Sequence, residues 1–255
     1  MFNISRMPFM GVEIKIVIPS YQRPDKVYSM KAISNALICI PESEYSDYAR
    51  NYDKTRIVCH PDSIKGLALK RQWIYEQFGN VFMVDDDCKA FTRLYVSAGE
   101  LADMNADEAY EIIQYIGNCA KLAGCYLFGI NTNVNPIAYS GLKPIRLTGF
   151  LNGTIGLLEG SELYFPQSAG LVDDYFVSGL NAYIYRKCWI DDRFSVKCAD
   201  TFVAQGGSAM TRTLDQEERD TLFLRKVFGE AVLMKQDTQI AKRKHEFQRT
   251  MKIPY

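Results

Sequence analysis

The chain has 255 residues with 30 acidic and 30 basic side chains, and 47% of its residues are hydrophobic. Its zero formal net charge gives no overall attraction to nucleic acid or to a membrane surface. A chain of this length can bury a core without disulfides or a structural metal. We therefore predict one α/β domain over residues 1–255. Seven cysteines without C-x-x-C spacing favour reduced thiols in a cytoplasm, and no apolar run is long enough to span a membrane.

Strands and helices alternate along the first third of the chain. Strands are predicted at 13–18, 56–59 and 80–84, and helices at 25–38 and 67–78. This alternation predicts an open, mostly parallel sheet flanked by helices, the Rossmann-like arrangement of α/β folds. Ligands of such sheets bind just beyond the carboxyl ends of the strands, where the following loops converge.

The remainder of the chain is less regular. Apolar residues at helical spacing predict a helix at 105–123, and the apolar run at 125–130 is typical of a strand. Residues 131–172 are rich in Gly, Asn, Ser and Pro, which predicts loops and short strands. The last predicted elements are a helix at 174–186, a helix at 215–228 with Asp215 as N-cap, a strand at 231–234 and a basic tail from Lys235.

Three consecutive aspartates, Asp85, Asp86 and Asp87, follow the buried-strand run NVFMV. Adjacent carboxylates repel one another unless cations offset their charge. A hard divalent ion with oxygen ligands does this while it also holds a diphosphate. Alternate residues of an extended segment point the same way, so Asp85 and Asp87 are able to share one target. We predict a metal or nucleotide site here, with a solvated acidic turn as the alternative.

The end of the first predicted strand places polar groups at the same edge of the sheet. Pro19 cannot continue a central strand, and Ser20, Tyr21 and Arg23 follow it closely. Tyr21 suits stacking on a base, and Arg23 suits pairing with a phosphate. A proline-rich loop with a solvated Arg23 is the alternative.

Gly66 stands at the entrance of the predicted helix 67–78, and Lys70 and Arg71 lie in its first turns. A glycine here leaves room for a ligand, while the helix N-terminus and the basic side chains favour anions. Ordinary solvated helix residues are an equally good explanation of Lys70 and Arg71. Neither G-x-G-x-x-G nor a P-loop motif occurs, so dinucleotide and P-loop binding are not supported.

In this order and spacing, the segments IVIPSYQRP, GLALKRQ and VFMVDDD resemble the nucleotide-binding half of GT-A glycosyltransferases. They most resemble the phage-type branch associated with hypermodified DNA bases and TET/JBP oxygenases. The resemblance implies a GT-A fold with a nucleotide-sugar-binding half at 13–90, an acceptor-binding half at 125–234 and a basic C-terminal tail at 235–255. It also implies a hexosyl- or pentosyltransferase that uses a nucleoside-diphosphate sugar, most often a UDP-sugar, together with Mn²⁺ or Mg²⁺.

The resemblance further implies roles for individual residues. Asp87 would hold a divalent metal bound to the diphosphate, and Asp85 would face the ribose or base. Asp86 is able to exchange roles with either neighbour, because the sequence does not determine the local backbone. The residues implied to contact the nucleotide are Pro19, Ser20, Tyr21, Arg23, Gly66, Arg71, Asp85 and Asp86.

An acidic pair, Asp173 and Asp174, lies at the predicted start of a helix. Many GT-A enzymes carry an acidic pair that faces the acceptor, and inverting members use one carboxylate to deprotonate the acceptor hydroxyl. We predict an inverting reaction with Asp174 as the base and Asp173 as the other candidate. An N-cap followed by a first-turn acid is the structural alternative. A second pair, Asp191 and Asp192, is predicted to form a turn.

His245 lies in the basic tail directly after Lys242, Arg243 and Lys244. GT-A enzymes often complete the metal site with a late histidine, so the resemblance makes His245 a candidate metal ligand beside Asp87. A solvated run of charges is the alternative explanation. His60 is predicted to be a loop residue.

The sequence as a whole predicts a metal-dependent glycosyltransferase that moves a sugar from a UDP-sugar to an acceptor hydroxyl. The resemblance suggests a 5-hydroxymethylpyrimidine of phage DNA as the acceptor, such as 5-hydroxymethylcytosine, which would place the protein in the host cytoplasm. Candidates to surround a flipped base are Tyr139, Phe150, Tyr164 and Phe165. Saccharide, lipid-linked and protein acceptors stay open, as do a nucleotidyltransferase and a non-catalytic nucleotide-binding module of related fold.

Overall fold

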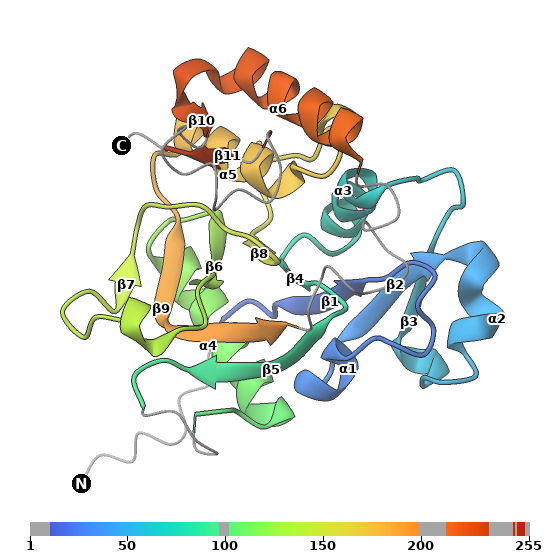
Figure 1. Ribbon diagram of the computed structural model, residues 1–255. Coiled ribbons are helices and arrows are strands. Elements are labelled where there is room, and N and C mark those ends of the chain that lie inside the picture. Colours follow the sequence, from blue (N-terminus) through green and yellow to red (C-terminus); the bar gives the residue numbers. More distant parts are fainter. Residues whose placement is uncertain (1–10, 97–101, 199–212, 235–246, 248, 253–255) are drawn as a thin grey trace, which may run out of the picture.

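The computed structural model describes residues 11–96, 102–198, 213–234, 247 and 249–252, and one mixed sheet runs through the described part (Figure 1). Its strands are β1 (Lys15–Pro19), β2 (Leu37–Pro41), β3 (Ile57–His60), β4 (Val81–Val84), β5 (Cys88–Arg93), β6 (Leu127–Asn131), β7 (Ile145–Arg146), β8 (Thr154–Leu157) and β9 (Trp189–Cys198). Their order is β3-β2-β1-β4-β8-β6-β9-β5, and β7 pairs with β9. A separate pair of strands consists of β10 (Val232–Met234) and β11 (Arg249–Met251).

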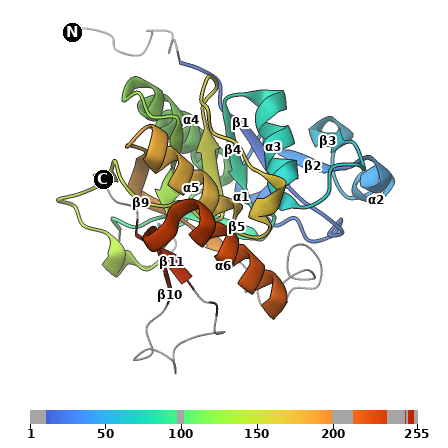
Figure 2. The same cartoon turned by 90° about the horizontal axis from the view of Figure 1, so that it is seen from above.

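Helices cover both faces of the sheet. The α-helices are α1 (Ser29–Ala32), α2 (Tyr45–Tyr48), α3 (Leu67–Phe78), α4 (Ala106–Leu122), α5 (Asp173–Ile184) and α6 (Leu214–Phe228). Short 3-10 helices cover Glu42–Glu44, Lys54–Arg56, Pro136–Ala138, Gln167–Ala169 and Gly229–Ala231. Figure 1 shows α3, α5 and α6 on one side of the sheet and α1 and α4 on the other. In Figure 2, α6 lies over α5 and next to the β10–β11 pair.

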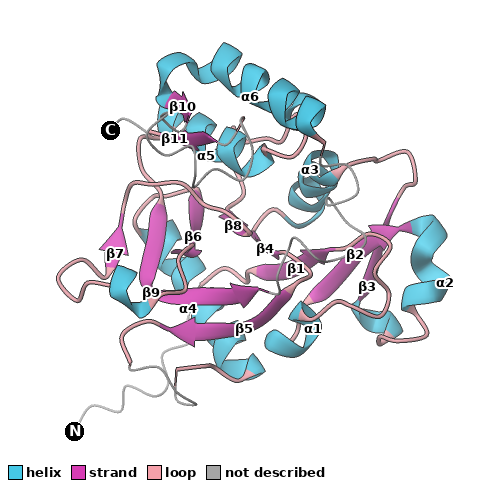
Figure 3. Ribbon diagram, in the orientation of Figure 1, coloured by secondary structure: helices cyan, strands magenta, loops and turns pink. Residues whose placement is uncertain are grey.

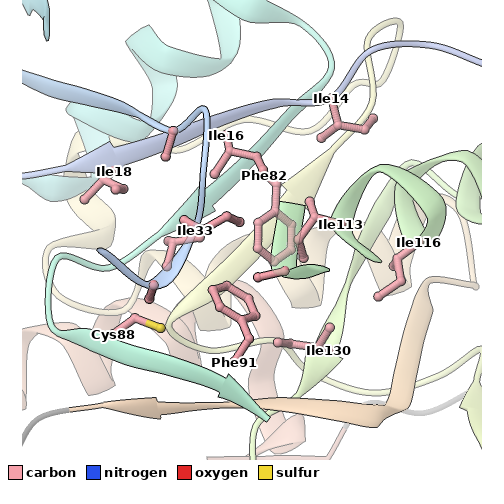
Figure 4. Packing of buried hydrophobic residues seen from close by; sticks show 14 of the residues in the cluster. Ile14, Ile16, Ile18, Ile33, Phe82, Cys88, Phe91, Ile113, Ile116 and Ile130 are labelled. Atoms are coloured by element: carbon pink, nitrogen blue, oxygen red, sulfur yellow. The ribbon is translucent and has the colours of Figure 1, made fainter. Parts of the chain in front are cut away.

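Alternation along the strands divides the core between these two faces. In β1, Ile16 and Ile18 belong to one hydrophobic cluster and Val17 to the other, because successive side chains of a strand point to opposite faces. The first cluster also contains Ile113 and Ile116 of α4, which pack toward the sheet in Figure 4. The second cluster is completed by residues of α3, α5 and α6.

Parallel pairing brings several strand ends to one edge of the sheet. β1 is parallel to β2 and β4, and β2 is parallel to β3. β8 runs antiparallel between β4 and β6, and β5 and β7 are antiparallel to β9. The predicted open α/β sheet flanked by helices is confirmed. The loops that follow β1, β2, β3 and β4 therefore meet at the carboxyl edge, where such folds bind ligands.

Residues 25–38 differ from the prediction of one helix. They form only the four-residue α1, and Asn35 after it takes a φ of 54°, which is incompatible with a continuing helix. The next residues, LICIP, form β2 between β1 and β3 and are largely buried. Tertiary pairing thus overrides the helical spacing of the apolar residues.

Three smaller predictions are also wrong, and the first concerns His60, which is the buried last residue of β3 and not a loop residue. Asp191 and Asp192 do not form a turn but lie inside β9, buried and paired with arginines. The N-cap of α6 is Thr213, whose side chain accepts from the amide of Gln216, whereas Asp215 lies in the first turn. Strand pairing and the arginines decide the conformation of the two aspartates, whereas the cap of α6 is a local hydrogen bond that begins the helix two residues earlier than predicted.

Three further features of the described residues bear on the sequence predictions. All seven cysteines lie in the described ranges and are free thiols. Within those ranges, no helix combines the length and the apolar character needed to cross a membrane. Long loops link β6 to β7 and β8, as the pink segments of Figure 3 show, in agreement with the loops and short strands predicted for residues 131–172.

Gly156 of β8 is expected to tolerate no larger side chain. A Cβ atom at this position would overlap the ring of Phe128, and both residues lie in fully buried strands. We expect Gly156→Ala to lower the free energy of unfolding by about 1–3 kcal/mol, measured by urea denaturation. Gly141→Ala is the control, because its Cβ would approach only the Tyr139 hydroxyl, at 3.9 Å. Equal stability of the two variants would contradict this packing.

Candidate functional site

The turn that follows β4 carries the three aspartates and lies at the carboxyl edge of the parallel strands. The amide of Asp85 donates to the carbonyl of Gly153 over 3.1 Å, so the segment that enters β8 closes one side of the turn. The two segments meet because β4 and β8 are antiparallel neighbours, with Val84 opposite Thr154. Gly153 takes a φ of 71°, a left-handed conformation that glycine adopts without steric cost.

Arg71 of α3 joins this turn to the start of α5. Its guanidinium donates to Oδ1 of Asp85 at 2.7 Å and to Oδ2 of Asp173 at 2.5 Å. The side chains of Arg71 and Asp173 are each 3% exposed. Burial lowers the pKa of Arg71, but the two carboxylates outweigh this effect and raise the pKa above its usual value. Arg71 therefore stays charged and holds together segments that are 102 residues apart in the chain.

Asp86 contacts the loop that follows β1. One carboxylate oxygen accepts from the Ser20 hydroxyl at 2.8 Å, and the other accepts from the Arg23 guanidinium at 2.8 Å. The Ser20 hydroxyl also hydrogen bonds with the hydroxyl of Tyr48 at 2.8 Å. All of these side chains are buried. The sequence predicted that Ser20 and Arg23 face a nucleotide, but the Ser20 hydroxyl and the Arg23 guanidinium donate to Asp86.

Burial destabilises the charged form of all three carboxylates of the turn and raises the pKa of each, that of Asp86 despite its pairing with Arg23. Burial and then the charge of Asp86 raise the pKa of Asp87. Desolvation by the surrounding protein and the charges of Asp87 and Asp86 raise the pKa of Asp85 to about 6, although 39% of its side chain is exposed. A cation relieves such repulsion. In the described part of the chain, however, no three His, Cys, Asp or Glu side chains are placed to hold a metal.

Asp173 and Asp174 begin α5, as predicted, and have different surroundings. Asp173 is 2% exposed and is engaged by Arg71. Asp174 is less deeply buried, and one of its oxygens accepts from the amide of Tyr175 at 2.8 Å. Desolvation and the negative charge of Asp173 raise the pKa of Asp174 to about 7. Asp174 is therefore a carboxylate that exchanges its proton near neutral pH, as acid–base residues do.

An open cavity of about 610 Å³ lies between the loops that follow β1, β2 and β3. Tyr21 lines it, with 45% of its surface exposed. Polar and apolar side chains both line the cavity, and its charged lining residues are Glu44, Asp47, Asp62 and Lys65. It therefore offers an aromatic face and several carboxylate hydrogen-bond acceptors at the same edge of the sheet as the aspartate turn.

The first turns of α3 are more buried than solvated helix residues would be. Lys70 is 5% exposed, donates to the carbonyl of Ser20, and has its Nζ 5.6 Å from the centre of the Tyr21 ring. Burial lowers the pKa of Lys70. Gly66 takes a φ of 91°, and a Cβ there would meet no atom within 4 Å. The helix entrance is thus open, while its two basic side chains support the loop after β1 and the carboxylate cluster.

Residues 14–132 match the family model described as TET-associated glycosyltransferase. This part of the chain is therefore similar to the TET-associated glycosyltransferases. The comparison with curated proteins found no match. The matched segment of the glycosyltransferase runs from β1 to β6 and includes Ser20, Arg71 and the aspartate turn, whereas Asp173 and Asp174 lie beyond it. The family suggested by the three short motifs is confirmed.

One predicted site residue of the glycosyltransferase, His245, lies outside the described ranges. The three basic residues before it also lie outside those ranges, and the role of His245 as a metal ligand stays a prediction. Met234, before this segment, and Arg249, after it, are paired neighbours in β10 and β11. Tyr48 and Gly153 were not found from the sequence, because each acts through contacts with residues far away in the chain.

Proposed function

We propose that the protein transfers a sugar from a nucleoside-diphosphate sugar, in particular a UDP-sugar, to an acceptor hydroxyl, and that the reaction depends on Mn²⁺ or Mg²⁺ and inverts the anomeric configuration. The Arg71 bridge carries this proposal, because it places the aspartate turn after β4 beside the acid pair of α5. A donor site and a base held in fixed relation are what a direct displacement at the anomeric carbon requires.

The nucleoside part of the donor is assigned to the cavity beside Tyr21. The three carboxylates of its lining repel a phosphate, but they accept hydrogen bonds from ribose hydroxyls and from base N–H groups. The exposed ring of Tyr21 suits stacking on the base. The diphosphate then extends toward Asp85 and Asp87, past the open helix entrance at Gly66, where an anion is favoured. Pro19 and the main chain of Ser20 border this path.

The aspartate turn fits a hard divalent cation that it shares with a diphosphate. Mg²⁺ in phosphate-handling sites is typically held by one or two carboxylates together with substrate oxygens and water. Asp85 and Asp87 supply such carboxylates, and no third protein ligand is required of the described residues. A cation bound there offsets the charge that develops on the leaving diphosphate. Asp86, engaged by Ser20 and Arg23, holds the turn in place.

Asp174 is the proposed base. Asp173 is buried and its carboxylate is already engaged by the Arg71 guanidinium at 2.5 Å. Asp174 has a pKa of about 7 and is able to accept the proton of the acceptor hydroxyl at neutral pH. With the diphosphate leaving on the side of the aspartate turn and the base on the side of α5, the displacement inverts the sugar.

The proposed acceptor is a 5-hydroxymethylpyrimidine of DNA, in the cytoplasm in which the seven free thiols are stable. Among the four aromatic residues that the sequence singled out, Phe150 lies beside the acid pair, since its ring centre is 4.5 Å from that of Tyr175. Phe165 is 1% exposed and belongs to the core. The half-buried Phe150–Tyr175 pair is thus the candidate to contact a planar acceptor. The match to TET-associated glycosyltransferases supports this acceptor class.

A thermal-shift experiment with UDP tests the donor site. UDP at about 100 times its Kd, with Mn²⁺, is expected to raise the Tm of the wild type by about 5 °C. Asp87→Ala removes a carboxylate of the cation site and is expected to abolish this rise, whereas Asp215→Ala on α6 is the control and should respond like the wild type. A UDP-sugar should also release UDP to water without an acceptor, which a binding module would not do.

One outcome of the thermal-shift experiment would contradict the proposal. If no nucleoside diphosphate or UDP-sugar shifts the Tm with Mn²⁺, Mg²⁺ or EDTA, the glycosyl-transfer proposal is wrong for this site. A shift that persists in EDTA and in Asp87→Ala would instead show nucleotide binding that does not use the aspartate turn.

A further inference from the structure

The hydroxyl of Ser29 contacts the main chain of the aspartate turn at two places. Ser29 begins α1 and is fully buried. Its Oγ donates to the carbonyl of Asp85 and accepts from the amide of Cys88 at 3.1 Å. Its own amide donates to the carbonyl of Asp86 at 3.4 Å. The helix that Ser29 begins lies on the face of the sheet opposite to α3 (Figure 1), and Ser29 hydrogen bonds to three main-chain groups of the turn.

The Ser29 contacts lie on both sides of Asp87 along the chain. The two groups that share the Ser29 hydroxyl, the carbonyl of Asp85 and the amide of Cys88, stand on either side of Asp86 and Asp87 in the chain. A hydroxyl that bonds to both limits the separation of these groups and therefore the path of the backbone between them. The other contacts described above hold the side chains of Asp85 and Asp86 or the amide of Asp85. The Ser29 contacts differ from these because they also reach the main chain on the far side of Asp87, where β5 begins.

We propose that Ser29 is a positioning residue that orients the carboxylates of Asp85 and Asp87 toward the donor diphosphate and its cation. The inference rests on the proposed function for the identity of the ligand. Partners that orient the direct ligands of a metal commonly change metal affinity by 10-fold or more when they are removed. A hydroxyl that only filled space would leave ligand affinity unchanged once the variant is folded.

The test compares Ser29→Ala with a matched control, Ser34→Ala. Ser34 lies just beyond α1, and its buried hydroxyl has no hydrogen-bond partner among the described residues. Calorimetric titration with UDP in the presence of Mn²⁺ is expected to give a Kd about 10-fold higher for Ser29→Ala and an unchanged Kd for Ser34→Ala. Ser29→Cys retains the shape of the side chain but hydrogen bonds weakly. It should give a Kd between those of the wild type and Ser29→Ala, and it replaces Ser29→Ala in the titration if that variant does not fold.

Amide hydrogen exchange on the ligand-free protein provides a second readout. The Cys88 amide should exchange faster in Ser29→Ala than in the wild type, while amides of α4 should be unchanged. Unchanged exchange and an unchanged Kd in Ser29→Ala would overturn the inference, as would equal losses of affinity in Ser29→Ala and Ser34→Ala. Faster local exchange in a protein whose wild type binds no nucleotide would support the restraint on the turn and count against the proposed function.

Discussion

Replacing Asp174 with asparagine is expected to lower kcat for sugar transfer by about 10³-fold, within the range that one acid–base group contributes. The amide cannot accept a proton from the acceptor hydroxyl, but it retains nearly the same shape at the start of α5. The Kd for UDP with Mn²⁺ should change little, because the donor is bound by the cavity and the aspartate turn. Steady-state kinetics with a UDP-sugar and a hydroxymethylated DNA acceptor measures the loss.

The matched control for this variant is Asp107→Asn. Asp107 occupies the first turn of α4 as Asp174 occupies that of α5, but it lies on the other side of the sheet. Its replacement should leave kcat unchanged. An Asp174→Asn enzyme with normal kcat would exclude Asp174 as the base. If Asp173→Asn lost kcat and retained wild-type stability while Asp174→Asn remained active, Asp173 would be the base.

The pH dependence of the wild type should agree with this assignment. Because the pKa of Asp174 is raised to about 7, the base is protonated and inactive at lower pH. We expect kcat/KM to fall by about 10-fold for each pH unit well below 7 and to level off above it, as for one essential base in the free enzyme. This limb should be absent from the residual activity of Asp174→Asn.

Replacing Arg71 with methionine is expected to lower the free energy of unfolding by about 3–5 kcal/mol. The guanidinium is almost fully buried and neutralises Asp173, which is also buried, and Asp85. Without it, a buried carboxylate loses its partner, and the repulsion between the turn and the start of α5 is no longer offset. Chemical denaturation measures the change. Arg71→Lys retains the charge but not the fork that reaches two carboxylates, so part of the loss should persist.

Arg50→Met serves as the control for Arg71→Met. Arg50 pairs with Asp47 at 3.0 Å, but the two side chains are 74% and 54% exposed, and exposed pairs contribute little to stability. We expect no measurable change in its free energy of unfolding. Arg71→Met with the stability of the wild type would contradict the bridge, and with it the fixed relation of donor site and base.

The sequence predicted best the elements that depend on short-range patterns. The helix at 67–78 and the strand that precedes the three aspartates appear within one residue of the prediction, because a glycine at each end of the helix and an apolar run ended by charges are local signals. By contrast, β2 was missed, because the run LICIP fits a helix or a strand equally well until β1 and β3 lie on either side of it.

For the site, the sequence by itself predicted which strand ends carry polar residues at the carboxyl edge. The aspartates after β4 and the polar loop after β1 lie there because both follow parallel strands, whereas the acid pair of α5, which the family resemblance suggested, is joined to the turn by Arg71. The family match of residues 14–132 agrees with the three motifs of the first half.

Only the tertiary structure decided what these charges do. Arg23 and Arg71, which the sequence predicted to meet a nucleotide, are buried against Asp86 and against Asp85 and Asp173. The Arg23–Asp86 and Arg71–Asp173 pairs join residues 63 and 102 positions apart. Whether an arginine binds a ligand or another part of its own chain depends on which carboxylate lies within reach after folding and on how little water surrounds the pair. Neither property is encoded in a short motif.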